Sequence, residues 1–479
     1  MPQVPKRVAV IGAGPAGAIA TDALAKEEAL DLIRVFERQT AIGGTWIFEP
    51  ERKSKIPSLE ALQERNSDRP VQIPRDIPCF TPPSEDINSH TERFSDTGTH
   101  ENLHSNLPPD IMCFSQEPIP PVVSEHSLSA YGPAAPFRHR DVMRKWILAI
   151  FERGGYEGLV ELGTTVELAE RLENEWILTL RKFIPEKNCN YWWSERFDSL
   201  VVATGHYYLP YIPTIPGIRE YDARFPGSIW HSKHYSSLDS CENKRVVVVG
   251  GSISAFDALH DIRRVAKTPV ISALRRPSPI YGPAAFSHPD IDNRSQISSF
   301  DAKTGRINFA DGSSVDNVDI VLFATGYDFS LPFLPKIQEV HKRIPGLYAH
   351  VFKIDDPTLA FVGMVAGGFG IRVFEWQAVA AARVLSGHAK LPSRKEMEQW
   401  EDNRLKERGE GGPFWTLMPD FEKHFHLLKA IAGDPAPGTA GRLLPEFDPK
   451  WADTFWEFIR YRTEIWQRDA AKAEKRSQL

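Results

Sequence analysis

A short apolar run followed by a glycine-rich turn constrains the fold of this chain more than any other feature. Arg7 to Ile11 is continuously apolar after its first residue, the segment GAGPAG follows directly, and Ala18 to Ala29 has the alanine-rich composition of a helix. A second apolar run occupies Leu32 to Phe36. This order predicts a strand, a helix and a second strand, the unit from which parallel sheets of α/β proteins are built.

The glycine turn has the spacing GxGxxG, with Gly12, Gly14 and Gly17 at its fixed positions. The first glycine makes the turn, the second lets a pyrophosphate approach the backbone, and the third packs the helix on the strand. Glu37, at the end of the second strand, would accept hydrogen bonds from ribose hydroxyls and repel a 2′-phosphate, which predicts FAD or NAD rather than NADP. The predicted contacts of this unit are Gly12, Gly14, Pro15, Ala16, Gly17, Glu37 and Arg38.

A second unit of the same design begins near residue 244. Arg245 to Val249 predicts a strand, GGSISA its turn, Phe256 to Ala266 a helix and Val270 to Leu274 the next strand. Two arginines stand where the first unit has its acid, and paired guanidinium groups favour a 2′-phosphate, so this unit is predicted to bind NADPH. Its predicted contacts are Gly250, Ser252, Ser254, Ala255, Arg275 and Arg276. Solvated arginines at a strand end remain the alternative for the last two.

The segments outside these two units predict how the domains are connected. Strands are predicted at Leu200 to Ala203 and Val318 to Ala324, each followed by or ending in ATG, and the proline-rich segment YYLPYIPTIPG connects the units. We predict an α/β fold with two Rossmann-like domains, the NADPH domain being inserted into the FAD domain. Residues 1–210 would form the first part of the FAD domain, with a polar surface excursion at 49–95, residues 211–330 the NADPH domain, and residues 331–479 the completion of the FAD domain with a helical C-terminal region.

Shorter patterns complete the expected secondary structure. The remaining predicted elements are a helix at Arg140 to Phe151, strands at Thr164 to Val166 and Trp176 to Leu180, and a helix at Phe374 to Leu385.

Composition excludes several other functions. The formal net charge is −6 without a long basic run, which argues against nucleic-acid binding. The four cysteines include no CxxC pair, which argues against a disulfide framework, a metal site or a dithiol relay. Two nucleotide sites of opposite charge preference then imply hydride transfer from NADPH to a bound flavin, with O₂ as the default acceptor.

The ends of the chain carry no clear targeting signal. No secretory leader or long apolar segment is apparent, so we expect a cytoplasmic protein without a membrane anchor. Ser477, Gln478 and Leu479 only faintly resemble a peroxisomal address, because glutamine replaces its lysine. A homodimer is possible.

A motif between the two glycine turns carries a family resemblance. Phe225, Gly227, His231 and Tyr235 form FxGxxxHxxxY, which resembles the fingerprint of the flavin-containing monooxygenases, class B flavoproteins. The segments GGTW, LHSNLPPDIMCF, ATGHY and FATGYD resemble the same family; they start at Gly43, Leu103, Ala203 and Phe323. The resemblance covers about residues 6–390 and leaves out residues 49–95 and the tail.

The resemblance implies an NADPH- and FAD-dependent monooxygenase. Its C4a-hydroperoxyflavin would transfer one oxygen atom from O₂ to nitrogen or sulfur of a small organic substrate. Baeyer–Villiger enzymes usually carry tryptophan at the last fingerprint position, where this chain has Tyr235. GGTW, however, also resembles the Baeyer–Villiger version, so ketone oxygenation stays open, as does a non-catalytic flavin-binding redox sensor.

The resemblance also implies roles for individual residues. Asn106 would lie near flavin N5, unless it only initiates the Pro-Pro turn. His231 and Tyr235 would couple the domains and brace NADP, or simply pack, and His206 could be a similar brace. Glu375 and Gln377 would begin a helix that approaches the isoalloxazine, or a plain amphipathic helix. The catalytic predictions are Asn106, His231 and Tyr235, and the further cofactor contacts are Gly44, Thr45, Trp46, His104, Asn106, Val166, Ala203, Thr204, Gly205, Ala324, Thr325, Gly326 and Gln377.

Overall fold

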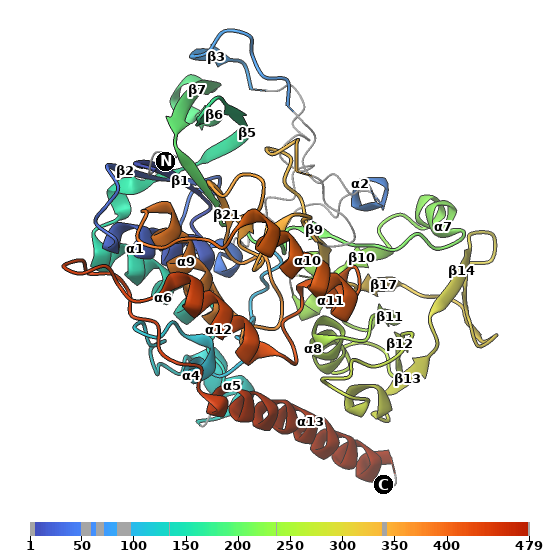
Figure 1. Ribbon diagram of the computed structural model, residues 1–479. Coiled ribbons are helices and arrows are strands. Elements are labelled where there is room, and N and C mark those ends of the chain that lie inside the picture. The colour runs from blue at the N-terminus through green and yellow to red at the C-terminus, as the bar shows by residue number, and fades with distance from the viewer. Residues whose placement is uncertain are drawn as a thin grey trace.

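Two separate parallel sheets organise the chain (Figure 1). The computed structural model describes residues 5–48, 59–63, 71–83, 97–133, 135–235, 237–337 and 343–477. The first sheet consists, from edge to edge, of β19 (Leu347–Tyr348), β20 (Phe352–Lys353), β21 (Leu359–Phe361), β8 (Ser199–Val202), β1 (Arg7–Ile11), β2 (Leu32–Glu37) and β4 (Val160–Leu162). Its five strands from β21 to β4 are parallel, as the sequence predicts.

The apolar run of β1 serves both faces of this sheet because successive side chains point in opposite directions. Val8 and Val10 pack among the helices α1 (Pro15–Lys26), α6 (Arg140–Gly154) and α9 (Arg372–Leu385). Ala9 and Ile11 pack against a four-stranded antiparallel sheet. That sheet has the order β3 (Cys79–Thr81), β7 (Cys189–Phe197), β6 (Glu175–Ile184) and β5 (Thr164–Leu172), and it stands at the top of Figure 1.

The second parallel sheet has the order β10 (Ile229–His231), β17 (Ile320–Phe323), β11 (Val246–Val249), β12 (Val270–Ala273) and β13 (Ile291–Arg294). Val246 and Val248 face α8 (Ile253–Ile262), whereas Val247 and Val249 face the other core. That other core is closed by α7 (Ile218–Arg224) and by a small sheet of β14 (Ile297–Asp301), β15 (Arg306–Phe309) and β16 (Ser314–Val315). Sequence reasoning found neither this small sheet nor β7.

All strands of the second sheet lie between β8 and β19 in the chain, so one Rossmann-like unit is inserted into the other, as predicted. The chain passes between the two units twice, and the two connecting segments pair with each other. β9 (Leu209–Pro210), in the segment that leads into the second unit, pairs antiparallel with β18 (Tyr327–Asp328), in the segment that leads back to the first. The proline-rich connector is therefore half of a two-stranded link; the boundaries near residues 210 and 330 remain predictions.

Most predicted elements are present with shifted ends. The first helix begins at Pro15 instead of Ala18, and α8 begins at Ile253 instead of Phe256, because each helix starts directly after its glycine turn. The remaining helices are α2 (Leu59–Gln63), α4 (Pro109–Met112), α5 (Glu125–Tyr131), α10 (Arg394–Arg408), α11 (Gly412–Trp415), α12 (Phe421–Ala432) and α13 (Pro449–Ser477). Among the described helices, none is both long and apolar enough to cross a bilayer.

Of the predicted surface excursion at 49–95, the structure describes only residues 59–63 and 71–83. These residues pack against both a core and a sheet edge. Leu59 in α2 is buried in the core of the second unit, and Gln63 accepts a hydrogen bond of 3.0 Å from Arg219 in α7. β3 adds an edge strand to the antiparallel sheet. The segment predicted as a surface excursion therefore contributes Leu59 to a core. The last two residues of the Ser477–Leu479 signal lie outside the described residues.

Candidate functional site

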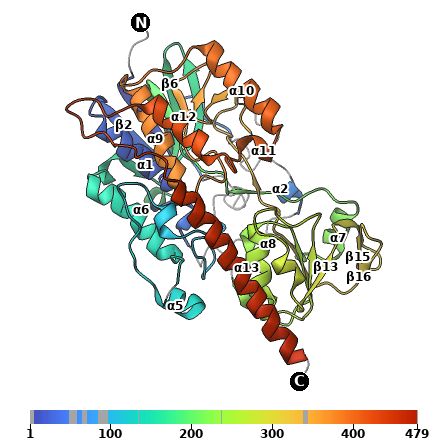
Figure 2. The ribbon, with the colours of Figure 1, turned by 60° about the horizontal axis from the view of Figure 1, so that its bottom comes forward.

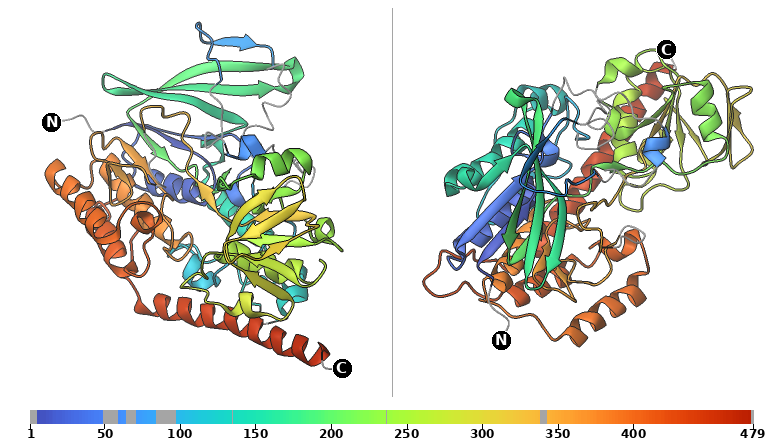
Figure 3. Two further views of the ribbon diagram at one scale, coloured as in Figure 1. Left: turned by 90° about the vertical axis from the view of Figure 1, so that its right-hand side faces the viewer. Right: turned by 90° about the horizontal axis from the view of Figure 1, so that it is seen from above.

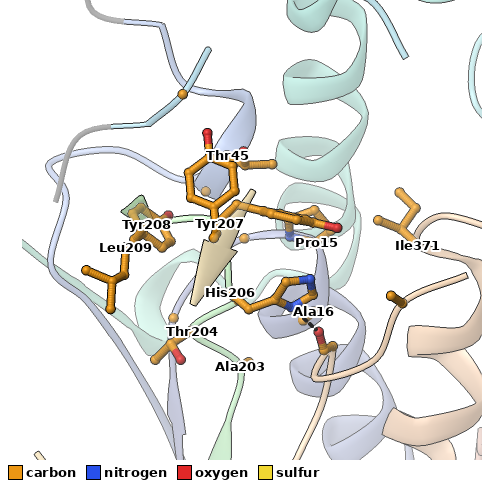
Figure 4. A pocket seen from close by; sticks show the side chains of 18 of the residues that line it. Pro15, Ala16, Thr45, Ala203, Thr204, His206, Tyr207, Tyr208, Leu209 and Ile371 are labelled. Carbon is orange, nitrogen blue, oxygen red and sulfur yellow. Dashed lines mark hydrogen bonds between the residues drawn. The ribbon is translucent and has the colours of Figure 1, made fainter. Parts of the chain in front are cut away.

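A cavity of about 970 Å³ lies where the two glycine turns face each other. This volume is near the top of the range of small-molecule sites, roughly 300–1,000 Å³. Figure 4 shows residues from three parts of the chain converging on it: Pro15 and Ala16 after β1, the segment from Ala203 to Leu209 after β8, and Ile371 before α9. Ser252 and Ser254, at the start of α8, line the same cavity. The cavity therefore joins both predicted nucleotide sites.

The first glycine turn is packed too tightly for side chains. Gly12 has a φ of +108°, a conformation that favours glycine, and a Cβ added there would lie 2.6 Å from the Ala203 carbonyl oxygen. A Cβ on Gly17 would lie 1.9 Å from the Gly12 carbonyl oxygen. The third glycine thus lets α1 begin against β1, as its position in the motif predicts.

The Glu37 carboxylate is fixed at the end of β2 and lines the cavity. One oxygen accepts a hydrogen bond of 2.7 Å from the Ala13 N–H, and the other accepts one of 2.8 Å from the Gln39 N–H. Burial raises the pKa of Glu37, and these hydrogen bonds oppose the rise. Each oxygen retains a lone pair for a ribose hydroxyl. Beside it, the Arg38 guanidinium lies 4.6 Å from the centre of the Tyr208 ring.

Buried polar atoms in the cavity wall indicate a polar ligand. Among the described residues, Thr204 Oγ1 and Trp46 Nε1 are buried without a hydrogen-bond partner, and both residues line the cavity. Such groups are costly to bury unless something pairs with them. Together with the tight turn and Glu37, they fit FAD, whose pyrophosphate and hydroxyls would supply partners.

His206 and Gln377 hold Gly363 from two sides. His206 Nδ1 donates a 3.0 Å hydrogen bond to the Gly363 carbonyl oxygen, and the Gly363 N–H donates one of 2.9 Å to Gln377 Oε1. Burial lowers the pKa of His206 to about 4, so its ring is neutral at pH 7. Gly363 and His206 line the cavity, whereas Gln377 lies behind them. Gln377 thus reaches the cavity only through Gly363.

Helix α9 approaches the cavity with other residues than the resemblance implies. Phe374 of its first turn lines the cavity, together with Ile371 just before it, but Glu375 does not. Glu375 is fully buried on the opposite side, where its carboxylate pairs with Arg442 at 2.8 Å and accepts a hydrogen bond of 2.8 Å from Ser115 Oγ. The start of α9 thus reaches the cavity through Ile371 and Phe374, while Glu375 serves an ion pair away from it.

The fingerprint residues divide between the cavity and its support. Tyr235 is buried and lines the cavity, and burial raises its pKa. His231 does not line it: Nε2 donates a 2.9 Å hydrogen bond to the Gly326 carbonyl oxygen, while Nδ1 accepts one of 3.1 Å from the Lys233 N–H. Burial lowers the pKa of His231 to about 3. His231 is thus a neutral brace at the base of the β9–β18 link.

The loop before α4 brings His104 and Asn106 to the cavity. Asn106 is exposed there, with its amide available to a ligand. His104 is held by the Asn102 carbonyl oxygen at 2.7 Å and by Ser127 Oγ at 3.1 Å. Burial lowers its pKa to about 4, so this ring is also neutral at pH 7.

The second glycine turn repeats the tight packing of the first. Gly250 has a φ of +141°, and a Cβ there would lie 2.5 Å from the Ala324 carbonyl oxygen. Ser252, the N-cap of α8, makes no capping hydrogen bond through its side chain, which leaves the first N–H groups of the helix for an anion. Arg275 and Arg276 are separated from the end of β12 by one residue and are exposed. This arrangement fits a nucleotide with a 2′-phosphate.

The cavity brings together most of the predicted contacts. It is lined by Gly12, Gly14, Pro15, Ala16, Glu37, Arg38, Gly44, Thr45, Trp46, His104, Asn106, Val166, Ala203, Thr204, Gly205, Tyr235, Ser252 and Ser254. Its lining does not include Gly17, His231, Gly250, Ala255, Arg275, Arg276, Ala324, Thr325, Gly326 or Gln377. Thr325, one of the predicted cofactor contacts, donates a hydrogen bond from its hydroxyl to the Tyr211 carbonyl oxygen.

Sequence reasoning missed much of the apolar wall. Val71 and Ile73 come from the excursion, Met418 from the segment before α12, and Phe455 from α13. No motif marks these positions, because any apolar side chain of suitable size can close a cavity. Among the described residues, no three His, Cys, Asp or Glu side chains gather as a metal site would require.

We expect the double variant Arg275→Ala, Arg276→Ala to raise KM for NADPH by roughly 100-fold. The variant would lose charge-assisted hydrogen bonds to the 2′-phosphate, and each of these contributes up to about 1.5–3 kcal/mol to binding. KM for NADH should change by less than about threefold, because NADH lacks that phosphate. Steady-state kinetics with both nucleotides checks this. Equal losses with NADH and NADPH would contradict the assignment.

Known proteins resemble the chain over most of its length. The family described as "Flavin-binding monooxygenase-like" matches residues 188–280 and 283–412. The flavin-containing monooxygenase FMO GS-OX3 of Arabidopsis thaliana is 31% identical over 406 residues, covering 82% of this chain and 76% of the relative. The flavin-containing monooxygenase ustF2 of Aspergillus flavus is 26% identical over 483 residues, covering 93% and 95%.

Solved structures share the fold. S-allyl-L-cysteine S-oxygenase from Allium sativum has a TM-score of 0.73 at 23% identity, covering 99% of this chain and 100% of the other. An open structure of cyclohexanone monooxygenase has a TM-score of 0.55 at 13% identity, covering 89% and 97%.

Proposed function

The chain belongs to the flavin-containing monooxygenase family, which uses FAD and NADPH, and from this premise we propose that it transfers one oxygen atom from O₂ to nitrogen or sulfur of a small organic substrate. The observation that carries the proposal is the shared cavity, in which the first glycine turn and the start of α8 face one volume. When bound there, FAD would take a hydride from NADPH and activate O₂. The residues of the chain have to hold both nucleotides and exclude water.

The two turns would divide the nucleotides between them. The backbone N–H groups of Gly14 and Ala16 and the Glu37 carboxylate would support FAD on one side, whereas the start of α8 with Arg275 and Arg276 would support NADPH on the other. Phe374 and Phe455 add an apolar wall that keeps water from the region between them.

The protonation states favour a soft nucleophile as substrate. His104 and His206 line the cavity and are neutral at pH 7, since burial lowers both pKa values to about 4. Neither ring can serve as a general acid at that pH. Oxygen transfer would then depend on the nucleophilicity of the substrate, which a thioether or an amine provides.

A turnover experiment with ¹⁸O₂ tests the proposal. The FAD-loaded protein is given NADPH, air and, in turn, a thioether, a tertiary amine and a cyclic ketone, and the products are analysed by mass spectrometry. We expect one labelled oxygen atom in the sulfoxide or the N-oxide. A labelled lactone as the main product would instead favour the Baeyer–Villiger alternative, to which GGTW points. No labelled product from any of the three would support the redox-sensor alternative.

We expect Asn106→Ala to increase the hydrogen peroxide released per NADPH several-fold, because the side chain is exposed to the cavity and its amide can hydrogen-bond to the reacting flavin. A peroxide assay alongside NADPH consumption measures this ratio. Asn102→Ala is the matched control, since Asn102 is an exposed residue of the same loop outside the cavity lining. An unchanged ratio in Asn106→Ala would reject the role of this residue.

A further inference from the structure

The C-terminal helix α13 packs against both Rossmann-like units. Phe458 and Ile459 are buried in the core that contains α1 and α9, whereas Trp466, further along the helix, is buried in the core that contains α8. In Figures 2 and 3 the helix runs along the outside of the molecule from the first unit past the second. This helix thus spans the junction at which the cavity lies.

Arg462 lies at the crossing point on this helix. Its guanidinium donates a hydrogen bond to the Asp257 carboxylate in α8. The same group lies 5.4 Å from the ring centre of Phe137 in the first unit and 5.7 Å from that of Phe256 in α8. Phe137 is itself buried and packs edge-on against Phe458 at 4.9 Å. One side chain therefore contacts an aromatic ring of each unit and a carboxylate of the cavity wall.

A second ion pair secures the far part of the helix. Arg263, at the end of α8, pairs with Asp469 at 2.6 Å, and its guanidinium lies 5.1 Å from the Trp466 ring centre. The Trp466 ring packs edge-on against Phe256 at 5.4 Å. Helix α8 is thereby held against α13 at two places, near its middle and at its end.

We propose that Arg462 is a positioning residue for hydride transfer, which fixes α8 and hence the NADPH-binding turn relative to the FAD-binding unit. Asp257 and Ser254 of α8 both line the cavity, so any rotation of α8 displaces the residues that would hold the reduced nucleotide. Hydride transfer requires the two nucleotides to be held at near-contact distance, and small misplacements reduce the rate strongly. A loosened α8 would also have to be ordered again each time NADP⁺ binds, which weakens binding.

The test uses the FAD-loaded protein without a substrate for oxygenation. Arg462→Met keeps an unbranched apolar stem at this position but removes the guanidinium group, and with it the contacts to Asp257, Phe137 and Phe256. We expect the Kd for NADP⁺, measured by calorimetry, to rise about tenfold, and the anaerobic rate of FAD reduction by NADPH to fall by a similar factor. Arg460→Met is the matched control, because Arg460 is an exposed arginine two residues away on the same helix; it should retain both values.

A merely structural role would give a different result. If Arg462→Met lowers Tm but leaves the Kd for NADP⁺ and the reduction rate within twofold of the wild type, the proposal is overturned. Should that variant fail to fold, Asp257→Asn tests the same contact from the side of α8; a weaker NADP⁺ complex supports the proposal, and unchanged values overturn it. Both measurements are independent of the oxygenated substrate, so they hold whichever substrate class proves correct.

Discussion

Replacing Arg442 with methionine is expected to lower the free energy of unfolding by about 3–5 kcal/mol, the usual cost of removing one partner from a buried ion pair. Arg442 is fully buried and pairs with Glu375 of α9 at 2.8 Å and with Asp22 of α1. Its removal leaves the buried Glu375 carboxylate without its ion-pair partner and leaves Asp22 with Lys26 at 3.0 Å, although Ser115 and Tyr156 still donate hydrogen bonds to the two carboxylates. Equilibrium unfolding in urea measures the loss.

An exposed arginine in an ion pair supplies the control for this prediction. Arg394 pairs with Glu398 on the surface of α10, and 68% of its side chain is exposed. Arg394→Met should cost at most about 1 kcal/mol, because solvent screens such pairs. Adding Asp22→Asn and Glu375→Gln to Arg442→Met should recover part of the stability, since the buried charges are then neutral. If Arg442→Met and Arg394→Met lower the free energy of unfolding equally, burial does not determine how much an ion pair contributes to stability.

The second large effect is expected at the first glycine turn. Gly17→Ala places a Cβ 1.9 Å from the Gly12 carbonyl oxygen, and this contact is with backbone, which cannot rotate away as a side chain can. The start of α1 must move, at a cost of about 3 kcal/mol, and we expect FAD affinity to fall roughly 100-fold. The ratio of flavin to protein absorbance after purification and a titration with FAD measure this loss.

Gly158→Ala separates this effect from the general cost of replacing glycine. Nothing lies within 4 Å of a Cβ at Gly158, and its φ needs no glycine, so FAD binding should be unchanged. If Gly17→Ala keeps its full flavin content, the turn is not part of the FAD site.

The sequence predicts well what is decided within a few residues. The central strands and the helices after both glycine turns follow from local patterns, because apolar runs, tight turns and helix starts are set by neighbours in the chain. Glu37 is recognisable for the same reason: its distance from the turn places it at the end of β2.

The sequence could not show which side chains from distant elements contact one another. Glu375 begins a helix beside the cavity, but its direction is decided by Arg442, which is 67 residues away in the chain. His231 matches the fingerprint, yet only the tertiary structure shows that its partner is the Gly326 carbonyl oxygen. Likewise, nothing near Arg462 indicates that it meets Phe137 and Phe256, because neither ring lies close to it in sequence.

The insertion of one unit into the other also determines the order in which the chain can be completed during synthesis. β8 ends at residue 202, but its parallel neighbour β21 begins only at residue 359, and α9, which covers α1, comes later still. The nascent first sheet therefore leaves the ribosome with an open hydrogen-bonding edge, which is prone to pair with other chains. The inserted unit has its own sheet and can fold before β21 is synthesised and pairs with the open edge of β8. Chaperone dependence of folding should therefore be greatest for chains truncated between residues 203 and 358.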